Sequence, residues 1–142
     1  MLFPEQLIDM GINAPKEHQR IISKLTTGLG SLYYQQHKID LEPLPETMID
    51  EGQTSPVPDI LLYDNQHYRT PVIIEVCHTN GVRNDIKKII RLIDEFDYGI
   101  EEGFLYDYAA RQWQRYTKGQ TETEIGVSYS EQLRLDLNEF LY

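Results

Sequence analysis

The sequence predicts a mixed α/β (α+β) fold in which helices cover both faces of a central, mixed β-sheet. Two apolar segments with strand character, residues 57–64 and 71–78, are separated by a short polar turn and are expected to pair. Two segments with hydrophobic residues at helical spacing, 15–29 and 83–99, lie before and after them. Helices and strands that alternate along a chain are typical of a sheet flanked by helices.

The N-terminal half predicts one helix and one strand before a long connection. Pro15 suits a first helical turn and opens the helix expected over residues 15–29. The tyrosine-rich segment 32–40 predicts a strand. Residues 41–56 are rich in proline and acidic side chains, which favours an irregular connection with a short strand around 47–49.

The C-terminal half predicts a buried strand, a helix, two more strands and a last helix. The run PVIIEVCH is almost continuously apolar, as expected of a strand buried on both faces. Gly99 is expected to end the helix that follows, and Ser130 is a candidate cap for the last helix. The expected elements are strands over 57–64 and 71–78, a helix over 83–99, strands over 102–108 and 112–117, and a helix over 130–141.

Length and composition predict one ordinary globular domain. The 142 residues suit a single core, so residues 1–142 are expected to form one domain, with 40% hydrophobic and 25% charged residues. No stretch approaches the roughly 20 apolar residues that cross a bilayer, so no membrane partner is expected. The single cysteine, Cys77, excludes an internal disulfide and fits a cytoplasmic location. A monomer and a homodimer both remain open.

The charge balance argues against a strong stand-alone nucleic-acid binder. The chain has 23 acidic and 13 basic residues, which gives a net charge of −10. Proteins that hold phosphate backbones by electrostatic attraction usually present a basic face. Here basic residues gather in one segment, 83–91, which could still face nucleic acid. Nucleic acid therefore remains a candidate partner that the overall acidity disfavours.

Two carboxylates occupy unusual places in apolar strands. Asp59 opens a strand that continues as ILLY, and Glu75 lies within VIIEVC. A carboxylate buried there carries a large desolvation cost unless a cation or hydrogen-bond donors compensate it. Because a short turn joins the strands, Asp59 and Glu75 are expected to lie side by side. Two converging carboxylates make a hard oxygen site that suits Mg²⁺ or Mn²⁺.

A purely structural interpretation competes with the metal site. Glu75 could pair with a buried arginine or lysine, and Asp59 could cap a turn after Pro58. The spacing of the two acids and the basic helix after them favour the metal site.

The order of these motifs resembles the PD-(D/E)XK, or restriction-endonuclease-like, nuclease superfamily. The resemblance extends from about residue 18 to residue 116 and is closest to the Uma-type endonuclease branch. That branch has an early histidine on a helix, a PD strand, an EV strand, and a lysine-bearing helix before a Gly-Val/Ile strand. The corresponding positions here are His18, Pro58-Asp59, Glu75-Val76, Asp85-Ile86-Lys87-Lys88 and Gly99-Ile100.

The resemblance implies a restriction-endonuclease-like core and metal-dependent hydrolysis of phosphodiester bonds in DNA or RNA. Asp59 and Glu75 would bind Mg²⁺ or Mn²⁺ together with the backbone carbonyl of Val76. The family normally has a lysine two residues after the glutamate, and this chain has Cys77 there. Strand alternation puts Cys77 on the same face as Glu75.

Two interpretations of this difference remain open. In the first, Lys88 or Lys87 of the following helix supplies the missing cation as a catalytic residue. In the second, the site is degenerate and the fold serves as a binding or assembly module.

Overall fold

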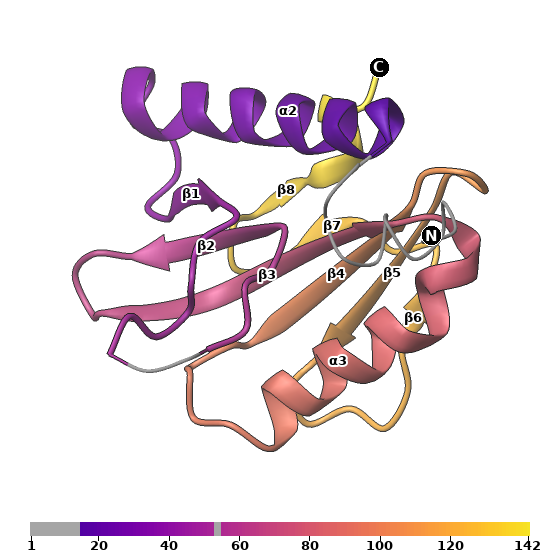
Figure 1. The fold of residues 1–142 in the computed structure, drawn as a ribbon. Coiled ribbons are helices and arrows are strands. Elements are labelled where there is room, and N and C mark those ends of the chain that lie inside the picture. The colour runs from indigo at the N-terminus through magenta and orange to yellow at the C-terminus, as the bar shows by residue number, and fades with distance from the viewer. Residues whose placement is uncertain (1–14, 53–54) are drawn as a thin grey trace, which may run out of the picture.

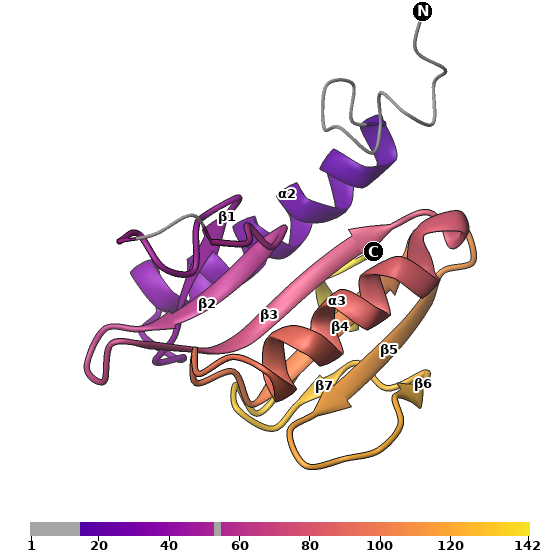
Figure 2. The same ribbon diagram turned by 60° about the horizontal axis from the view of Figure 1, so that its bottom comes forward.

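Two helices cover opposite faces of a six-stranded sheet (Figure 1 and Figure 2). The structure is a computed structural model, and it describes residues 15–52 and 55–142. The elements are α2 (Lys16–Gly30), η1 (Ser31–Gln35), β1 (Glu42–Pro45), β2 (Ile60–Asp64), β3 (Arg69–Cys77), η2 (Thr79–Gly81), α3 (Val82–Asp94), β4 (Glu102–Asp107), β5 (Gln112–Thr117), β6 (Glu124–Ile125), β7 (Tyr129–Ser130), β8 (Leu135–Asp136) and η3 (Leu137–Phe140). Within these ranges, no helix has both the length and the apolar character to cross a membrane.

The sheet is mixed, as predicted. Its strands follow the order β1-β2-β3-β4-β5-β6, and all neighbouring pairs are antiparallel except β3 and β4. Parallel neighbours need a crossover connection, and α3 supplies it. The expectation of helices on both faces is confirmed, because α2 and α3 lie on opposite sides of the sheet (Figure 1).

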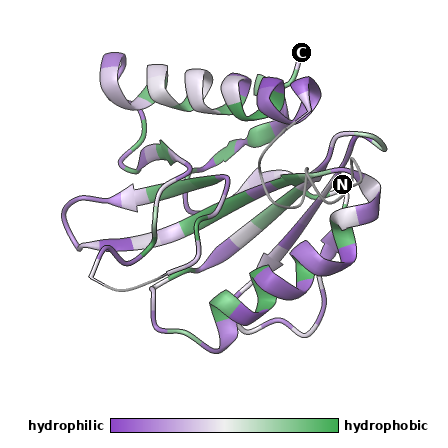
Figure 3. Ribbon diagram, in the orientation of Figure 1, coloured by the Kyte–Doolittle hydropathy of each residue, from purple (hydrophilic) through white to green (hydrophobic). Residues whose placement is uncertain are grey.

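Strand alternation divides the core into two layers. Val72, Ile74 and Val76 of β3 belong to the cluster under α2, whereas Ile73 and Cys77 belong to the cluster under α3. Figure 3 shows strongly hydrophobic residues along β2 and β3, in the middle of the sheet. The nearly continuous apolar run of β3 is therefore explained by burial on both faces.

A glycine on β4 allows α3 to pack closely on the sheet. A Cβ added to Gly103 would lie 2.4 Å from Cγ2 of Ile89 on α3 and 3.3 Å from Cδ1 of Ile93. Any larger residue would displace the helix. Gly103 therefore sets the distance between α3 and the strands that carry the candidate site.

Two predictions for the N-terminal half were wrong. Residues 32–40 do not form a strand, because α2 continues into the π-helix η1 and the N–H of Gln36 donates to the carbonyl of Ser31. Leu32 and Tyr33 continue to pack against the core under α2, and this packing overrides the strand propensity of tyrosine.

The short strand of the connection 41–56 forms earlier than residues 47–49. It is β1, which contains Pro43 and Pro45. Proline is tolerated there because β1 is an edge strand and needs only one set of ladder hydrogen bonds. Residues 53–54 lie outside the described residues.

The predicted C-terminal helix over 130–141 is also wrong. The segment forms a hairpin, β7–β8, followed by the short 3-10 helix η3. Ser130 caps no helix, because a hairpin follows it: its Oγ accepts the N–H of Leu133 within the turn, and its hydroxyl donates to the carboxylate of Glu102. Arg134 has a positive φ of 58°, which interrupts any helix at that point.

Other boundaries differ by a few residues. The helix predicted over 83–99 ends at Asp94, so Gly99 does not end it, and Phe96 stacks on Tyr98 in the following loop. The strand predicted over 57–64 begins at Ile60. The strands predicted over 71–78, 102–108 and 112–117 are found as β3, β4 and β5.

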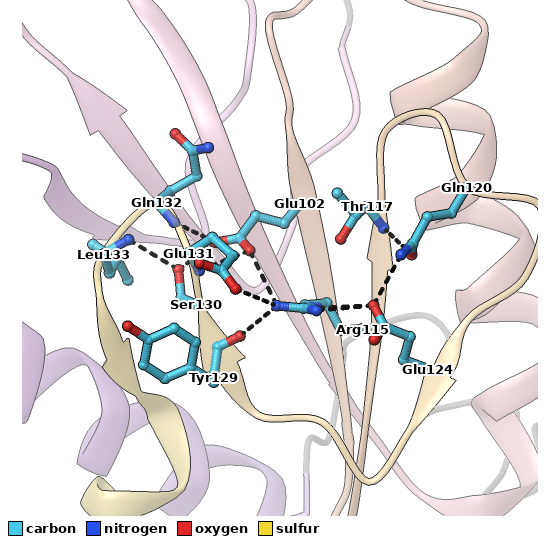
Figure 4. A network of polar contacts seen from close by, with 10 residues as sticks. All are labelled: Glu102, Arg115, Thr117, Gln120, Glu124, Tyr129, Ser130, Glu131, Gln132 and Leu133. Carbon is cyan, nitrogen blue, oxygen red and sulfur yellow. Dashed lines mark hydrogen bonds and ion pairs between the residues drawn. The ribbon is translucent and has the colours of Figure 1, made fainter.

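A buried carboxylate attaches the C-terminal hairpin to the sheet (Figure 4). Glu102 on β4 is 1% exposed and accepts hydrogen bonds from the hydroxyl of Ser130 and from the N–H groups of Glu131 and Gln132. Arg115 on β5 lies 4.0 Å from the same carboxylate and donates to the carbonyl of Tyr129. These contacts replace the capped helix that the sequence suggested.

We expect Glu102→Ala to lower the free energy of unfolding by about 3 kcal/mol, because it leaves buried donors and the Arg115 guanidinium without their acceptor. Chemical denaturation followed by circular dichroism measures this change. Glu131→Ala is the matched control, since Glu131 approaches the same guanidinium at 3.9 Å but is 69% exposed. The control should change stability by less than about 0.5 kcal/mol, and equal losses would contradict this account of the hairpin.

Candidate functional site

The sheet brings Asp59 and Glu75 together at the beginning of β2. Ile60 pairs with Ile74, so one further step in this antiparallel register sets Asp59 opposite Glu75. Oδ2 of Asp59 accepts a hydrogen bond of 2.7 Å from the N–H of Val76, which ties the acid to the neighbouring strand.

The main chain of Asp59 is held from its other side as well. Its carbonyl accepts a 3.0 Å hydrogen bond from the N–H of Glu46, just after β1. Asp59 thus bridges β1 and β3 immediately before β2 begins, although it lies outside the regular strand. The position of this side chain is fixed by backbone contacts of two strands.

Glu75 is a buried carboxylate with too little positive charge around it. It is 4% exposed and lies on the face of β3 that points to α3. Burial, followed by the negative charge of Asp59, raises the pKa of Glu75 to about 8, and Asp85 acts in the same direction. Lys88, whose Nζ lies 3.2 Å from Oε1, opposes the rise without cancelling it. The site therefore favours the binding of a proton or another cation.

His18 approaches Asp59 from α2. Its Nε2 lies 3.4 Å from Oδ2 of Asp59, and its side chain is 19% exposed. The hydrogen bond with Asp59 raises the pKa of His18, against the opposing effect of burial, and a backbone hydrogen bond with Val76 adds to the rise. The ring also contacts Tyr108 edge-on, at 6.4 Å between centroids. Oδ2 of Asp59 thus has two donors, one from the sheet and one from α2.

The two candidate lysines lie on different sides of α3. Lys88 forms the ion pair with Glu75, and its side chain is 37% exposed. Lys87 is exposed and lines a separate groove with Gln112 and Gln114 of β5. Adjacent helical residues are rotated by about 100°, which accounts for the separation. Of the two, only Lys88 reaches the acid pair.

Cys77 is on the same face as Glu75, as strand alternation predicts. Burial raises the pKa of its thiol, and the negative charges of Asp85 and Asp107 raise it further. The side chain is 7% exposed and packs against Gly81. A Cβ added to Gly81 would lie 3.4 Å from Cβ of Cys77. Cys77 is therefore a neutral packing residue. The nuclease superfamily that the sequence resembles normally has a lysine at this position.

Sequence reasoning included Asp85 in the motif of the lysine-bearing helix but gave it no part in the site. Asp85 raises the pKa of both Glu75 and Cys77 by its charge, so it faces the same region as Lys88. The signal was available, because positions 85 and 88 are three apart and share one face of a helix. A third acid explains further why a single lysine leaves the site electronegative.

The donor set fits a small, hard divalent cation. In residues 15–52 and 55–142, no three or more His, Cys, Asp or Glu side chains are arranged to hold a metal ion. The ligands that the resemblance implies are the carboxylates of Asp59 and Glu75 and the carbonyl of Val76. Mg²⁺ is commonly bound by one or two carboxylates, with water and substrate phosphate in the remaining positions. The residues present fit that pattern.

No protein-family model matches the chain, and no curated protein matches it by sequence. Among solved structures, the chain is similar to a protein from Anabaena variabilis described as a "putative nuclease belonging to DUF820". The TM-score is 0.63 at 18% identity, over 89% of this chain and 80% of that one. It is also similar to part of the DrdV–DNA complex, with a TM-score of 0.45 at 12% identity, over 78% of this chain and 12% of that one.

The mixed sheet, its flanking helices and the first of these similarities define the fold. The chain has a restriction-endonuclease-like fold. Its place in the Uma-type branch remains a prediction.

Proposed function

We propose that the protein is a metal-dependent nuclease that hydrolyses phosphodiester bonds in DNA or RNA, with Mg²⁺ or Mn²⁺ as its metal. The observation that carries the proposal is the buried Glu75, which shares its site with Asp59 and whose pKa stays raised although Lys88 lies beside it. A carboxylate pair of this kind has a high cost of burial unless a cation binds it. The restriction-endonuclease-like fold supports the same conclusion.

Each residue of the site has a role that follows from its contacts. Asp59 and Glu75 would hold the metal, with the carbonyl of Val76 as a third ligand. The N–H of Val76 and the ring of His18 both approach Oδ2 of Asp59, which orients the carboxylate before metal binds. A bound divalent metal supplies a more acidic water molecule and stabilises charge on the phosphate.

In the nuclease superfamily that the sequence resembles, a lysine lies on the strand two residues after the glutamate. Lys88 takes the role of that lysine here. Its ammonium group reaches Glu75 from α3, so the missing lysine at position 77 is replaced from a different element. With 37% of its side chain exposed, Lys88 can also contact a phosphate oxygen that enters from solvent. A cation in this place stabilises the negative charge that develops in the transition state.

Cleavage of nucleic acid by the purified chain tests the proposal. Labelled single- and double-stranded DNA and RNA would be incubated with Mg²⁺ or Mn²⁺, and products would be resolved by electrophoresis. We expect cleavage that is abolished by chelation and by Asp59→Asn. Asp40→Asn, at an exposed acid, is the matched control and should retain activity. No metal-dependent cleavage of any substrate, or equal cleavage by Asp59→Asn, would overturn the proposal.

A second candidate function is a non-catalytic binding or assembly module on the same fold. The neutral Cys77 in place of the family lysine, and the net charge of −10, favour this alternative. It predicts that the chain binds no divalent metal. Metal binding that disappears in Glu75→Gln would exclude it.

A further inference from the structure

A groove lies between α3 and β5, on the side of α3 that faces away from the acid pair. It encloses about 840 Å³, and its lining includes residues from η2, the first two turns of α3 and β5. Figure 2 shows α3 in front of β4, with β3 along one side of the helix and β5 along the other. The polar side chains that matter here are Asn80, Arg83, Lys87, Gln112 and Gln114.

The groove starts at the same end of the sheet as the candidate site. Cys77 and Asp107 are paired at the ends of the parallel strands β3 and β4, and Asp107 lines the groove. Lys88 faces Glu75 from one side of α3, whereas Arg83 and Lys87 face the groove from the other. A chain of phosphates that reaches the acid pair can therefore continue past the first turn of α3 into the groove.

The charges in the groove favour a polyanion. Among the described residues, Arg83 and Lys87 form no ion pair, in a chain whose net charge is −10. The one acid among the lining residues, Asp107, is 5% exposed. Its oxygens accept hydrogen bonds from the hydroxyl of Thr79 and from the N–H groups of Ala109 and Ala110. Its charge is thus stabilised locally.

We propose that this groove binds the sugar–phosphate backbone of the nucleic-acid strand on one side of the bond that is cut. The inference rests on the proposed nuclease function, and it identifies the surface that holds the substrate. Arg83 and Lys87 are one helical turn apart, about 6 Å along α3. A strand of nucleic acid presents one phosphate for about every 3.4 Å of its axis, so both cations can contact phosphates of one strand.

The uncharged lining suits the same ligand. Asn80, Gln112 and Gln114 supply amide groups, which donate to phosphate and sugar oxygens and also accept hydrogen bonds. A small anion would leave most of the groove unfilled. An extended phosphodiester strand matches its size, its two cations and its amide groups.

The salt dependence of binding tests the groove separately from cleavage. All proteins would carry Asp59→Asn so that the labelled oligonucleotide remains intact, and affinity would be measured by fluorescence anisotropy at several salt concentrations. Duplex DNA, single-stranded DNA and single-stranded RNA would be compared. The test variant is Arg83→Gln with Lys87→Gln. The matched control is Lys38→Gln with Lys118→Gln, which removes the same charge from exposed positions outside the groove.

We expect the groove variant to bind more weakly, with the slope of log K against log salt reduced by about 1.8 for duplex DNA or about 1.4 for a single strand. The control should keep the parent slope. The proposal that this groove binds nucleic acid would be overturned by equal slopes in the groove variant and the control. It would also be overturned if the parent bound no strand. Cleavage by the unmodified chain together with equal slopes would leave the nuclease function intact and remove only this inference.

Discussion

Glu75→Gln is expected to lower metal-dependent cleavage about 100-fold or more, while the fold remains intact. The substitution keeps the size of the side chain and removes one of the two carboxylates that would hold the metal. Metal stabilisation of the transition state is worth several kcal/mol, and about 1.4 kcal/mol corresponds to a factor of ten. The measurement is the cleavage rate at saturating Mg²⁺, alongside thermal unfolding of the same protein.

The same variant should alter how stability depends on pH. The pKa of Glu75 is raised from its ordinary value of 4.5 to about 8, so the folded protein binds this proton more tightly than the unfolded chain. In metal-free buffer its contribution to stability is therefore lost as pH rises from about 4.5 through about 8. Glutamine has no such proton, so Glu75→Gln should show a smaller loss over this range.

An exposed acid provides the control for Glu75→Gln. Glu122→Gln removes one negative charge from an exposed loop position and should change neither cleavage nor the pH profile of unfolding. If Glu75→Gln cleaved nucleic acid at the wild-type rate, Glu75 could not be an essential metal ligand. If its stability fell with pH as steeply as that of the wild type, the raised pKa would not belong to this group.

Lys88→Gln is expected to lower kcat about 100-fold, with a smaller change in KM. The ammonium group lies 3.2 Å from Oε1 of Glu75 and is the cation that would face charge developing on the phosphate. A purely structural ion pair predicts a different result, namely lower stability with little change in kcat. Steady-state kinetics at several substrate concentrations separates the two.

Three companion variants make the Lys88 experiment specific. Lys88→Arg should recover part of kcat, because it restores a cation on the same element. Lys87→Gln should raise KM instead, since Lys87 lines the groove on the other side of α3. Lys118→Gln, at an exposed position near the end of β5, should change neither constant. A wild-type kcat for Lys88→Gln would contradict the role given to this lysine.

The proximity of the acid pair could be predicted from sequence because it depends on local features. Two apolar runs joined by a short polar turn predict neighbouring strands, and the polar residue within each run is conspicuous. The observed register then sets Asp59 opposite Glu75. The proximity of the two acids does not itself indicate a function. The nuclease function was suggested by the resemblance of Asp59 and Glu75 to the PD-(D/E)XK motif.

Other parts of the site depend on tertiary packing and could not be obtained in this way. Whether Lys87 or Lys88 faces Glu75 depends on the rotation of α3, which is set by its packing against Gly103 and the strands. The turn at Ser130 depends on Glu102, 28 positions away in the sequence, which accepts from the hydroxyl of Ser130 and from the N–H groups of the next two residues. Local propensity cannot anticipate a partner at that separation.

Calorimetric titration with Mn²⁺ tests the central claim, that Asp59 and Glu75 form a divalent-metal site, most directly. We predict saturable binding to the wild-type chain, and loss of binding in both Asp59→Asn and Glu75→Gln. Asp40→Asn and Glu122→Gln, which remove the same charges from exposed positions, should bind as the wild type does. A wild-type chain that binds no metal, or variants of the acid pair that bind it unchanged, would contradict the account.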